Sequence, residues 1–261
     1  MLYSEPRNIT CADLAPRWDA TIALLSRQSC LLPSSYFESL AGLEDDRYWT
    51  FFDLIGCPSQ LVIPLMQLTS LVEEKEKISL MRWTSYNPVL VDKIEASIVD
   101  WKNPSLGIHD DISEEQMQQQ RDRWNCAEAW RYGLLLYITR VFRCDRNTSP
   151  PSRLATYARL ILEHVHSCRH TAIVQKQAFL PLFFAGCETR DQSSRQSIRY
   201  YCQYWDKNCG YDLFNTASSL LEDVWMEQDG SCNNHAWWGS VIDKKQKPYQ
   251  SHVAPLQFCF G

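Results

Sequence analysis

The sequence predicts an all-α protein that folds as a single helical domain of roughly nine or ten packed helices over residues 1–261. Apolar residues recur at steps of three and four through most of the chain, which is the spacing of one helix face. Alternating apolar and polar runs flanked by turns, the pattern of a strand, are absent. With 261 residues, 45% of them hydrophobic, the chain is long enough to bury a sizeable core.

Five helical segments are expected in the first hundred residues. Leu14, Trp18 and Ile22 share one face of the first segment. The fourth is expected to open at Pro58, because a proline in the first turn has no N–H to leave unpaired. Pro64 lies inside the apolar pattern of that segment and predicts a kink or a later start. The five segments span residues 14–25, 35–40, 48–55, 58–77 and 88–101.

A capping box marks the start of the longest predicted helix. Ser113 is followed three residues later by Gln116, a spacing that lets each side chain pair with the backbone N–H of the other residue. The helical pattern then continues to Arg143. Pro150 and Pro151 make residues 145–151 a predicted loop and the predicted hinge of the domain. Five further helices are expected at residues 152–170, 176–188, 193–207, 213–228 and 235–244.

Charge and motif content exclude several classes of function. A formal net charge of −5 disfavours binding to nucleic acid. The sequence contains no G-x-G-x-x-G or G-x-x-x-x-G-K-[ST] phosphate loop, no G-x-S-x-G nucleophile elbow and no C-x-x-C pair, so no cofactor is expected. It shows neither a secretory signal nor an apolar run long enough to span a membrane. We therefore expect an intracellular protein, cytoplasmic or nuclear, whose 11 cysteines are reduced.

A run of histidines in residues 164–170 suggests a metal site at first sight. On a helix, however, His164 and Cys168 share one face, while His166 and His170 share another. Each face then offers two ligands, whereas zinc takes three or four. Histidines near the end of a helix also interact favourably with its dipole. We therefore expect no metal site in this segment.

Residues 110–114 have the spacing D-D-x-x-E, in which carboxylates can hold magnesium ions that grip a pyrophosphate. This run resembles the first metal motif of class I terpene cyclases, and Asn215, Ser219 and Asp223 match their second motif loosely. Acidic residues ahead of the cap Ser113 also stabilise the N-terminus of a helix. The helix-start interpretation is favoured, because acidic helix starts are common.

Aromatic residues are abundant, with 10 Trp, 12 Tyr and 10 Phe. Large aromatic side chains are ordinary components of a hydrophobic core, because each buries a large apolar area. A cluster of them between helices is also how an apolar ligand pocket is built. The sequence alone leaves these two alternatives open.

Four segments in the same order resemble the C-terminal regulatory domain of fungal zinc-cluster transcription factors. Residues 180–188, read LPLFFAGCE, are similar to an apolar helix of that family with a Pro-Leu-Phe-x-Ala-Gly-Cys-Glu signature. Residues 220–225, LLEDVW, resemble its Leu-Leu-Glu-x-Val-Trp helix. Residues 54–65 resemble its Gly-Cys/Val-x-x-x-Leu helix opening, and residues 126–138 its Ala-Glu-Ala-aromatic and Leu-Tyr-Leu helix.

The resemblance implies a ligand-sensing regulatory domain, because some members hold an apolar small molecule, such as a sterol, in this helical domain. Residues expected to contact such a sterol-like, terpenoid-like or polyketide-like ligand are Trp130, Tyr137, Phe183, Phe184, Glu188, Tyr201, Trp225 and Trp237. Glu188 has apolar neighbours, so if it is buried it needs a partner. Arg190 can pair with it only if the helix has already ended.

The six-cysteine zinc head and basic linker of these regulators are not found in these 261 residues, so we expect no direct DNA binding. A homologous regulator or a second copy of the chain is a further expected partner. An alternative hypothesis is a biosynthetic enzyme that folds a polyene or terpenoid precursor for cofactor-independent cyclisation in secondary metabolism. Such an enzyme needs shape and preorganised polar groups rather than a strong nucleophile, so missing catalytic motifs do not exclude it.

Overall fold

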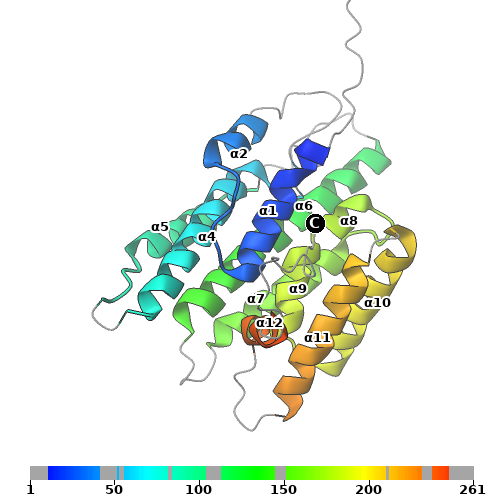
Figure 1. Cartoon of the computed structure of the whole chain (residues 1–261). Helices are drawn as coiled ribbons and strands as arrows, with labels where there is room; N and C mark the ends of the chain where they lie inside the picture. The colour runs from blue at the N-terminus through cyan, green and yellow to red at the C-terminus, as the bar shows by residue number, and fades with distance from the viewer. Residues whose placement is uncertain are drawn as a thin grey trace, which may run out of the picture.

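The computed structural model describes residues 11–41, 52, 56–81, 84–103, 113–144, 151–209, 212–230 and 237–246 (Figure 1). Within these ranges it contains eleven α-helices, one π-helix and no strand, which confirms the all-α fold class. The elements are α1 (Cys11–Ser26), α2 (Ser34–Ala41), α4 (Ser59–Ser79), α5 (Val89–Asp100), α6 (Glu114–Ile138), η1 (Thr139–Arg143), α7 (Ser152–Ser167), α8 (Ile173–Gln177), α9 (Phe179–Glu188), α10 (Gln192–Cys209), α11 (Leu213–Gly230) and α12 (Trp238–Gln246).

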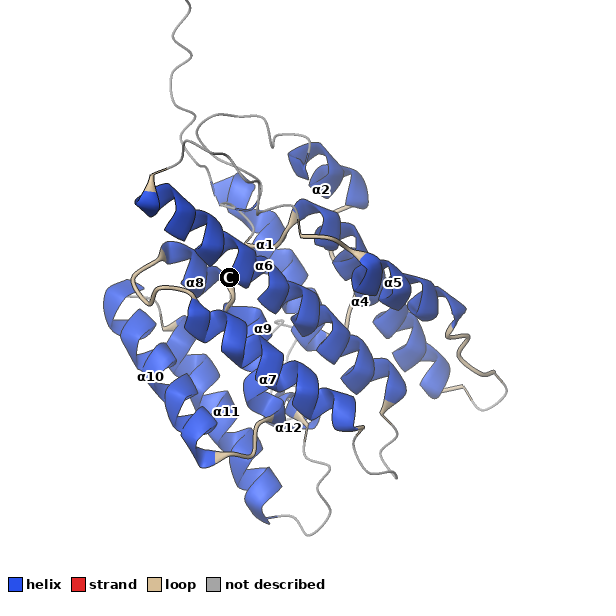
Figure 2. Cartoon of the chain, turned by 180° about the vertical axis from the view of Figure 1, so that it is seen from behind, coloured by secondary structure: helices blue, strands red, loops and turns tan. Residues whose placement is uncertain are grey.

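The long helices lie side by side, with α6, α7 and α9 in the middle of the molecule (Figures 1 and 2). The pair α4 and α5 flanks α6, and the pair α10 and α11 flanks α9 on the opposite side. Helix α1 packs against α4, and α12 packs against α11. Among the helices that the structure describes, none is long and apolar enough to cross a membrane.

Helix α9 is the centre of the core. Nine of its ten residues are buried, and it packs against α6, α7, α10 and α11. A helix that is apolar on every face is stable in water only when neighbours cover all of it. The sequence LPLFFAGCE therefore dictates the position of this helix in the fold.

The capping box at the start of α6 is confirmed. The side chain of Ser113 accepts a hydrogen bond from the backbone N–H of Gln116, and the Gln116 side chain accepts one from the N–H of Ser113. Helical structure also continues to Arg143 as predicted, but the last five residues form a π-helical turn. The N–H of Cys144 donates to the carbonyl of Thr139 at 3.0 Å, which is the wider i to i+5 bond of that turn.

The chain between α7 and α9 differs from the prediction. Helix α7 ends at Ser167 instead of residue 170, and the segment predicted as one helix over 176–188 divides into α8 and α9. Buried Gln175 explains the early end, because its side-chain amide donates to the carbonyls of Val165 and Cys168 at 3.1 and 3.4 Å. These bonds satisfy carbonyls at the end of α7 that have no partner within the helix.

Helix α4 begins directly after Pro58 and runs through Pro64. Of the two alternatives predicted from Pro64, a kink or a later start, the later start is therefore wrong, and the helix opens at Pro58 as predicted. Of the predicted segment 48–55, only residue 52 is described, and of the predicted hinge 145–151, only residue 151. The rest of both segments lies outside the described residues.

Helices α6 and α9 cross closely at Gly133. A Cβ atom at this position would lie 3.0 Å from Cβ and 3.3 Å from Cα of Pro181, a rigid ring on α9. Gly186 of α9 makes a similar approach to α11, where a Cβ would lie 2.9 Å from Cδ2 of Leu221. The missing side chains therefore set the distance between the central helix and two of its neighbours.

A buried arginine joins the ends of three helices. Arg195 of α10 is 1% exposed. Its guanidinium donates to the carbonyl of Thr189 after α9, to the side chain of Gln228, and to both carboxylate oxygens of Asp229 on α11. It also lies 5.3 Å from the ring centre of Trp225. A buried charge is tolerated when it is paired in this way.

Gly133→Ala is expected to lower the free energy of unfolding by about 1–3 kcal/mol, because the added methyl group meets the Pro181 ring. Gly230→Ala is the matched control, because a Cβ there meets nothing within 4 Å. It should leave stability unchanged or raise it by up to about 1 kcal/mol. Urea unfolding followed by circular dichroism measures both, and equal effects would contradict the close crossing.

Arg195→Met is expected to lower the free energy of unfolding by about 3 kcal/mol, because the buried Gln228 side chain and the Thr189 carbonyl lose the donor that Arg195 provides. Arg199→Met is the control: Arg199 lies on the same helix, also faces Trp225, and pairs with Glu222 nearer the surface. Its loss should cost less than about 1 kcal/mol. Thermal unfolding of both variants makes the comparison, and a small loss for Arg195→Met would contradict its structural role.

Candidate functional site

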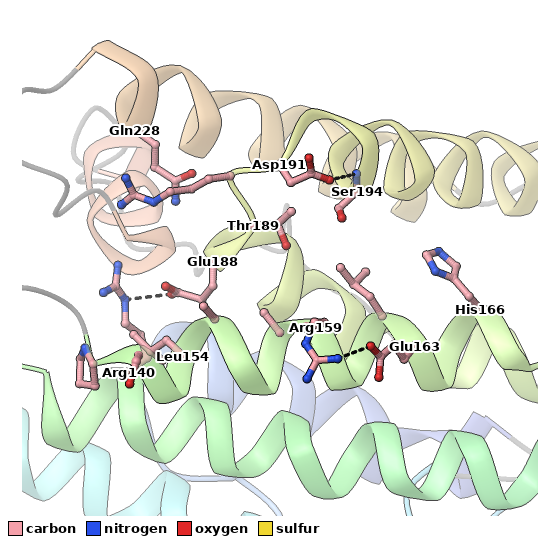
Figure 3. A pocket seen from close by; sticks show the side chains of 16 residues that line it. Arg140, Leu154, Arg159, Glu163, His166, Glu188, Thr189, Asp191, Ser194 and Gln228 are labelled. Atoms are coloured by element: carbon pink, nitrogen blue, oxygen red, sulfur yellow. Dashed lines mark hydrogen bonds and ion pairs between the residues drawn. The ribbon is translucent and has the colours of Figure 1, made fainter.

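A groove with a volume of about 810 Å³ lies between α7 and the C-terminal end of α9 (Figure 3). The wall formed by α7 presents the apolar side chains of Leu154, Ala158 and Leu162, with polar and charged side chains of the same helix beside them. The opposite wall is polar. The polar and charged lining residues are Arg140, Ser152, Arg159, Glu163, His166, Glu188, Thr189, Arg190, Asp191, Ser194 and Gln228.

The π-helical turn η1 brings Arg140 into this groove. Arg140 is 8% exposed, and its Nε atom lies 3.1 Å from Oε1 of Glu188 (Figure 3). Arg143, three residues later in the same turn, instead pairs with Asp92 and Glu95 of α5. The wide turn therefore directs one arginine to the groove and the other to the opposite side of α6. Such turns occur frequently at functional sites.

Glu188 is the last residue of α9, and its side chain is 8% exposed. Burial raises the pKa of its carboxyl to about 7, while Arg140 and Arg190 act in the opposite direction. The pair with Arg140 has the distance of an ion pair but not hydrogen-bond geometry at Glu188 Oε1. Charge attraction therefore offsets only part of the desolvation of this carboxyl.

Other polar groups along the groove are engaged in holding its walls. Asp191 accepts hydrogen bonds from the Ser193 hydroxyl and the Ser194 N–H at the start of α10, which lower its pKa to about 2. Arg159 pairs with Glu163 on the rim. These side chains are committed to structural partners, whereas Glu188 and Arg140 form a buried pair at one end of the groove.

Glu188 is the one residue among the eight predicted ligand contacts that lines this groove. Four of the seven predicted aromatics lie in the core with their polar atoms bonded to backbone. The indole N–H groups of Trp130 and Trp225 donate to the carbonyls of Gln177 and Gly186, and the hydroxyls of Tyr137 and Tyr201 donate to those of Leu24 and Gln175. Such bonds are typical of well-packed buried aromatics.

The structure brings some of the predicted aromatics together. Tyr137 and Phe184 pack at 5.4 Å between ring centres, and Phe183 lies 5.9 Å from Phe184. Trp237 is half-buried, with the Arg27 guanidinium 5.2 Å from its ring centre, and Trp238 connects it to this cluster. Tyr201 contacts Phe179 and Phe214 in another ring cluster.

The three described histidines of residues 164–170 point to different partners. His164 pairs with Asn125, His166 with Ser197, and the His170 ring lies edge-on to Tyr204. Within the described ranges, no group of three His, Cys, Asp or Glu side chains is placed to hold a metal ion.

The three residues that match the second terpene cyclase motif all lie on α11. Asn215 and Ser219 are exposed, whereas Asp223 pairs with Lys245 of α12. Asp110 and Asp111 of the first motif lie outside the described residues.

The described cysteines that the sequence places among apolar residues are buried. Burial raises the pKa of the Cys202 thiol to about 12 and that of Cys187 well above its usual value. Cys126 is 0% exposed. At neutral pH, the Cys187 and Cys202 thiols therefore stay protonated and act as small apolar groups rather than nucleophiles.

Sequence reasoning missed Arg140 as a site residue. Its signal was present, because it interrupts the most apolar stretch of the chain, where a buried guanidinium requires a partner. The prediction that Glu188 needs a partner is confirmed, and that partner is Arg140. Arg190 acts on Glu188 as well, because α9 has ended at Glu188.

Glu188→Gln is expected to change the pH dependence of stability. The folded protein binds a proton at Glu188 up to about pH 7, whereas the unfolded chain releases it near 4.5, so the wild type loses stability relative to the variant as pH rises through this window. The relative loss should reach about 3 kcal/mol at most, since each pH unit is worth about 1.4 kcal/mol. Urea unfolding of both proteins between pH 5 and 8 measures it, and parallel profiles would contradict the raised pKa.

A comparison with protein families matches residues 12–251 to the fungal specific transcription factor domain. No curated protein and no solved structure matches the sequence significantly. The match covers nearly the whole chain and includes all four segments that resemble this family. The chain therefore belongs to the family of fungal specific transcription factor domains.

Proposed function

We propose that this transcription factor regulatory domain senses a small, largely apolar molecule, and that the groove between α7 and α9 binds it. The observation that carries the proposal is the combination of an apolar wall with a buried charge pair in one groove of about 810 Å³. Small-molecule sites in proteins are clefts of about 300–1,000 Å³ with apolar walls and a few placed polar groups.

The position of the groove suits a sensor. One wall belongs to α7, and the other is built from the end of α9, the start of α10 and the end of α11. A ligand that contacts both walls stabilises their relative arrangement, and selective binding to one arrangement is how a small molecule changes the state of a domain. The hydrogen bonds of buried Arg195 join the end of α9, the start of α10 and the end of α11. The wall that these three segments form is therefore expected to move as one body.

Ligand contacts by the seven predicted aromatics stay a prediction. Six of their rings are buried in the core and Trp237 is half-buried against it, whereas the groove offers room without displacing any of them. Cyclase activity, a homologous regulator or second copy as partner, and the lack of direct DNA binding also stay predictions.

Neutral 1-decanol is expected to raise the melting temperature of the full chain. Binding to the folded state at about ten times Kd contributes about 1.4 kcal/mol. For a domain of this size, that corresponds to a rise of about 3 °C or more. Ala155→Trp, at an exposed position on the groove wall, should abolish the shift by filling the groove.

Ala96→Trp is the matched control, because Ala96 is an exposed alanine on α5, away from the groove. It should keep the full shift. A shift that survives Ala155→Trp would place the ligand elsewhere, for instance among the core aromatics. No shift for the wild type with decanol or with sterol and terpenoid probes would contradict the proposed function.

A further inference from the structure

We propose that the ligand is an amphipathic carboxylate, and that its head group takes the place of Glu188 beside Arg140 while Glu188 takes up one proton from water. This inference rests on the proposed function of the groove. It identifies the chemical class of the ligand and a coupling between ligand binding and protons.

The geometry at the end of the groove favours exchange of one carboxylate for another. Glu188 Oε1 is buried without a hydrogen bond, although it lies 3.1 Å from Arg140 Nε. A guanidinium is planar and binds a carboxylate best through two parallel N–H bonds. A ligand entering along the apolar wall formed by Leu154 and Ala158 arrives at this end of the groove, where Arg140 also lines the wall.

Charge balance gives the second argument. The described charged and titratable groups around Glu188 come from several elements. Helix α4, η1 and the residue after it contribute Lys75, Arg140 and Cys144, and α7 contributes Arg159, Glu163 and His166. The segment between α9 and α10 contributes Arg190 and Asp191, α10 contributes Arg195, and α11 contributes Asp229. Arg159 and Glu163 neutralise each other. Burial lowers the pKa of His166, which is neutral at pH 7.

Among the described residues, Arg140 and Arg190 act on Glu188, whereas exposed Asp191 accepts hydrogen bonds from Ser193 and Ser194, and exposed Asp229 pairs with Arg195. Lys75 is directed to the carbonyl of Val141 instead. Protonation of Glu188 removes one negative charge from this end of the groove, and a single ligand carboxylate restores it. Uptake of one anion and one proton together therefore leaves the charge of this end unchanged.

Glu188 is suited to the proton uptake because burial raises its pKa to about 7. The protonated, uncharged form of the Glu188 carboxyl is therefore populated near pH 7. Above about pH 7 the free protein is ionised at Glu188, so each ligand bound takes up one proton and affinity falls up to tenfold per pH unit. Below about pH 6 no uptake is required, and affinity is constant until the ligand carboxyl itself protonates near pH 5.

Titration calorimetry of the full chain with decanoate and 1-decanol between pH 6 and 9 tests this inference. The Kd of decanoate for the wild type should rise about tenfold from pH 7.5 to 8.5, and binding at pH 8 should take up close to one proton, while 1-decanol shows no pH dependence. In Glu188→Gln, decanoate should bind tightly without this slope. Arg140→Gln should weaken decanoate more than tenfold and spare 1-decanol.

Arg143→Gln is the matched control, because it removes the other arginine of η1, which faces α5, and it should keep the decanoate slope. Circular dichroism verifies that each variant is folded. Binding of 1-decanol without decanoate, or decanoate binding without a pH slope in the wild type, would overturn this inference and leave the proposed function intact. Binding of neither probe to the wild type would overturn both.

Discussion

The burial of α9 on all sides is the constraint on which the rest of the structure depends. This helix has no polar face, so its neighbours have to cover it completely. Gly133 and Gly186 let two of them approach closely, and the side chains of Trp225 and Gln228 supply donors to the carbonyls of Gly186 and Cys187 near its end. Because α9 is buried to its last residue, the acid at that position is buried as well.

A buried acid at the end of the central helix then shapes the site. The partner of Glu188, Arg140, lies in the π-helical turn that continues α6. Burying both charges of this pair carries a desolvation penalty in free energy, and the Coulomb attraction between them offsets only part of it. Such a pair adds little to stability. In this fold it lies beside an apolar wall, which suits a molecule with one polar end.

Features governed by neighbouring residues were predictable from the sequence. The capping box gave the start of α6, and the apolar run of residues 180–188 gave a helix whose glutamate needs a partner. Features set by distant contacts were not predictable. The early end of α7 depends on Gln175 folding back, and the partner of Glu188 lies on a helix far away in the chain. The core position of Trp130 and Trp225 depends on carbonyls that only the folded chain presents.

The π-helical turn also determines how this region of the chain would respond to the deletion of one residue. Its single extra residue sets the rotational phase of Arg140 relative to the rest of α6. Loss of one residue there would restore ordinary α-helical winding and rotate the following side chains by about 100°. The helix itself would survive, but the arginine would leave the groove. In this domain the pairing of Arg140 with Glu188 is therefore more sensitive to a one-residue deletion than the helix that carries the arginine.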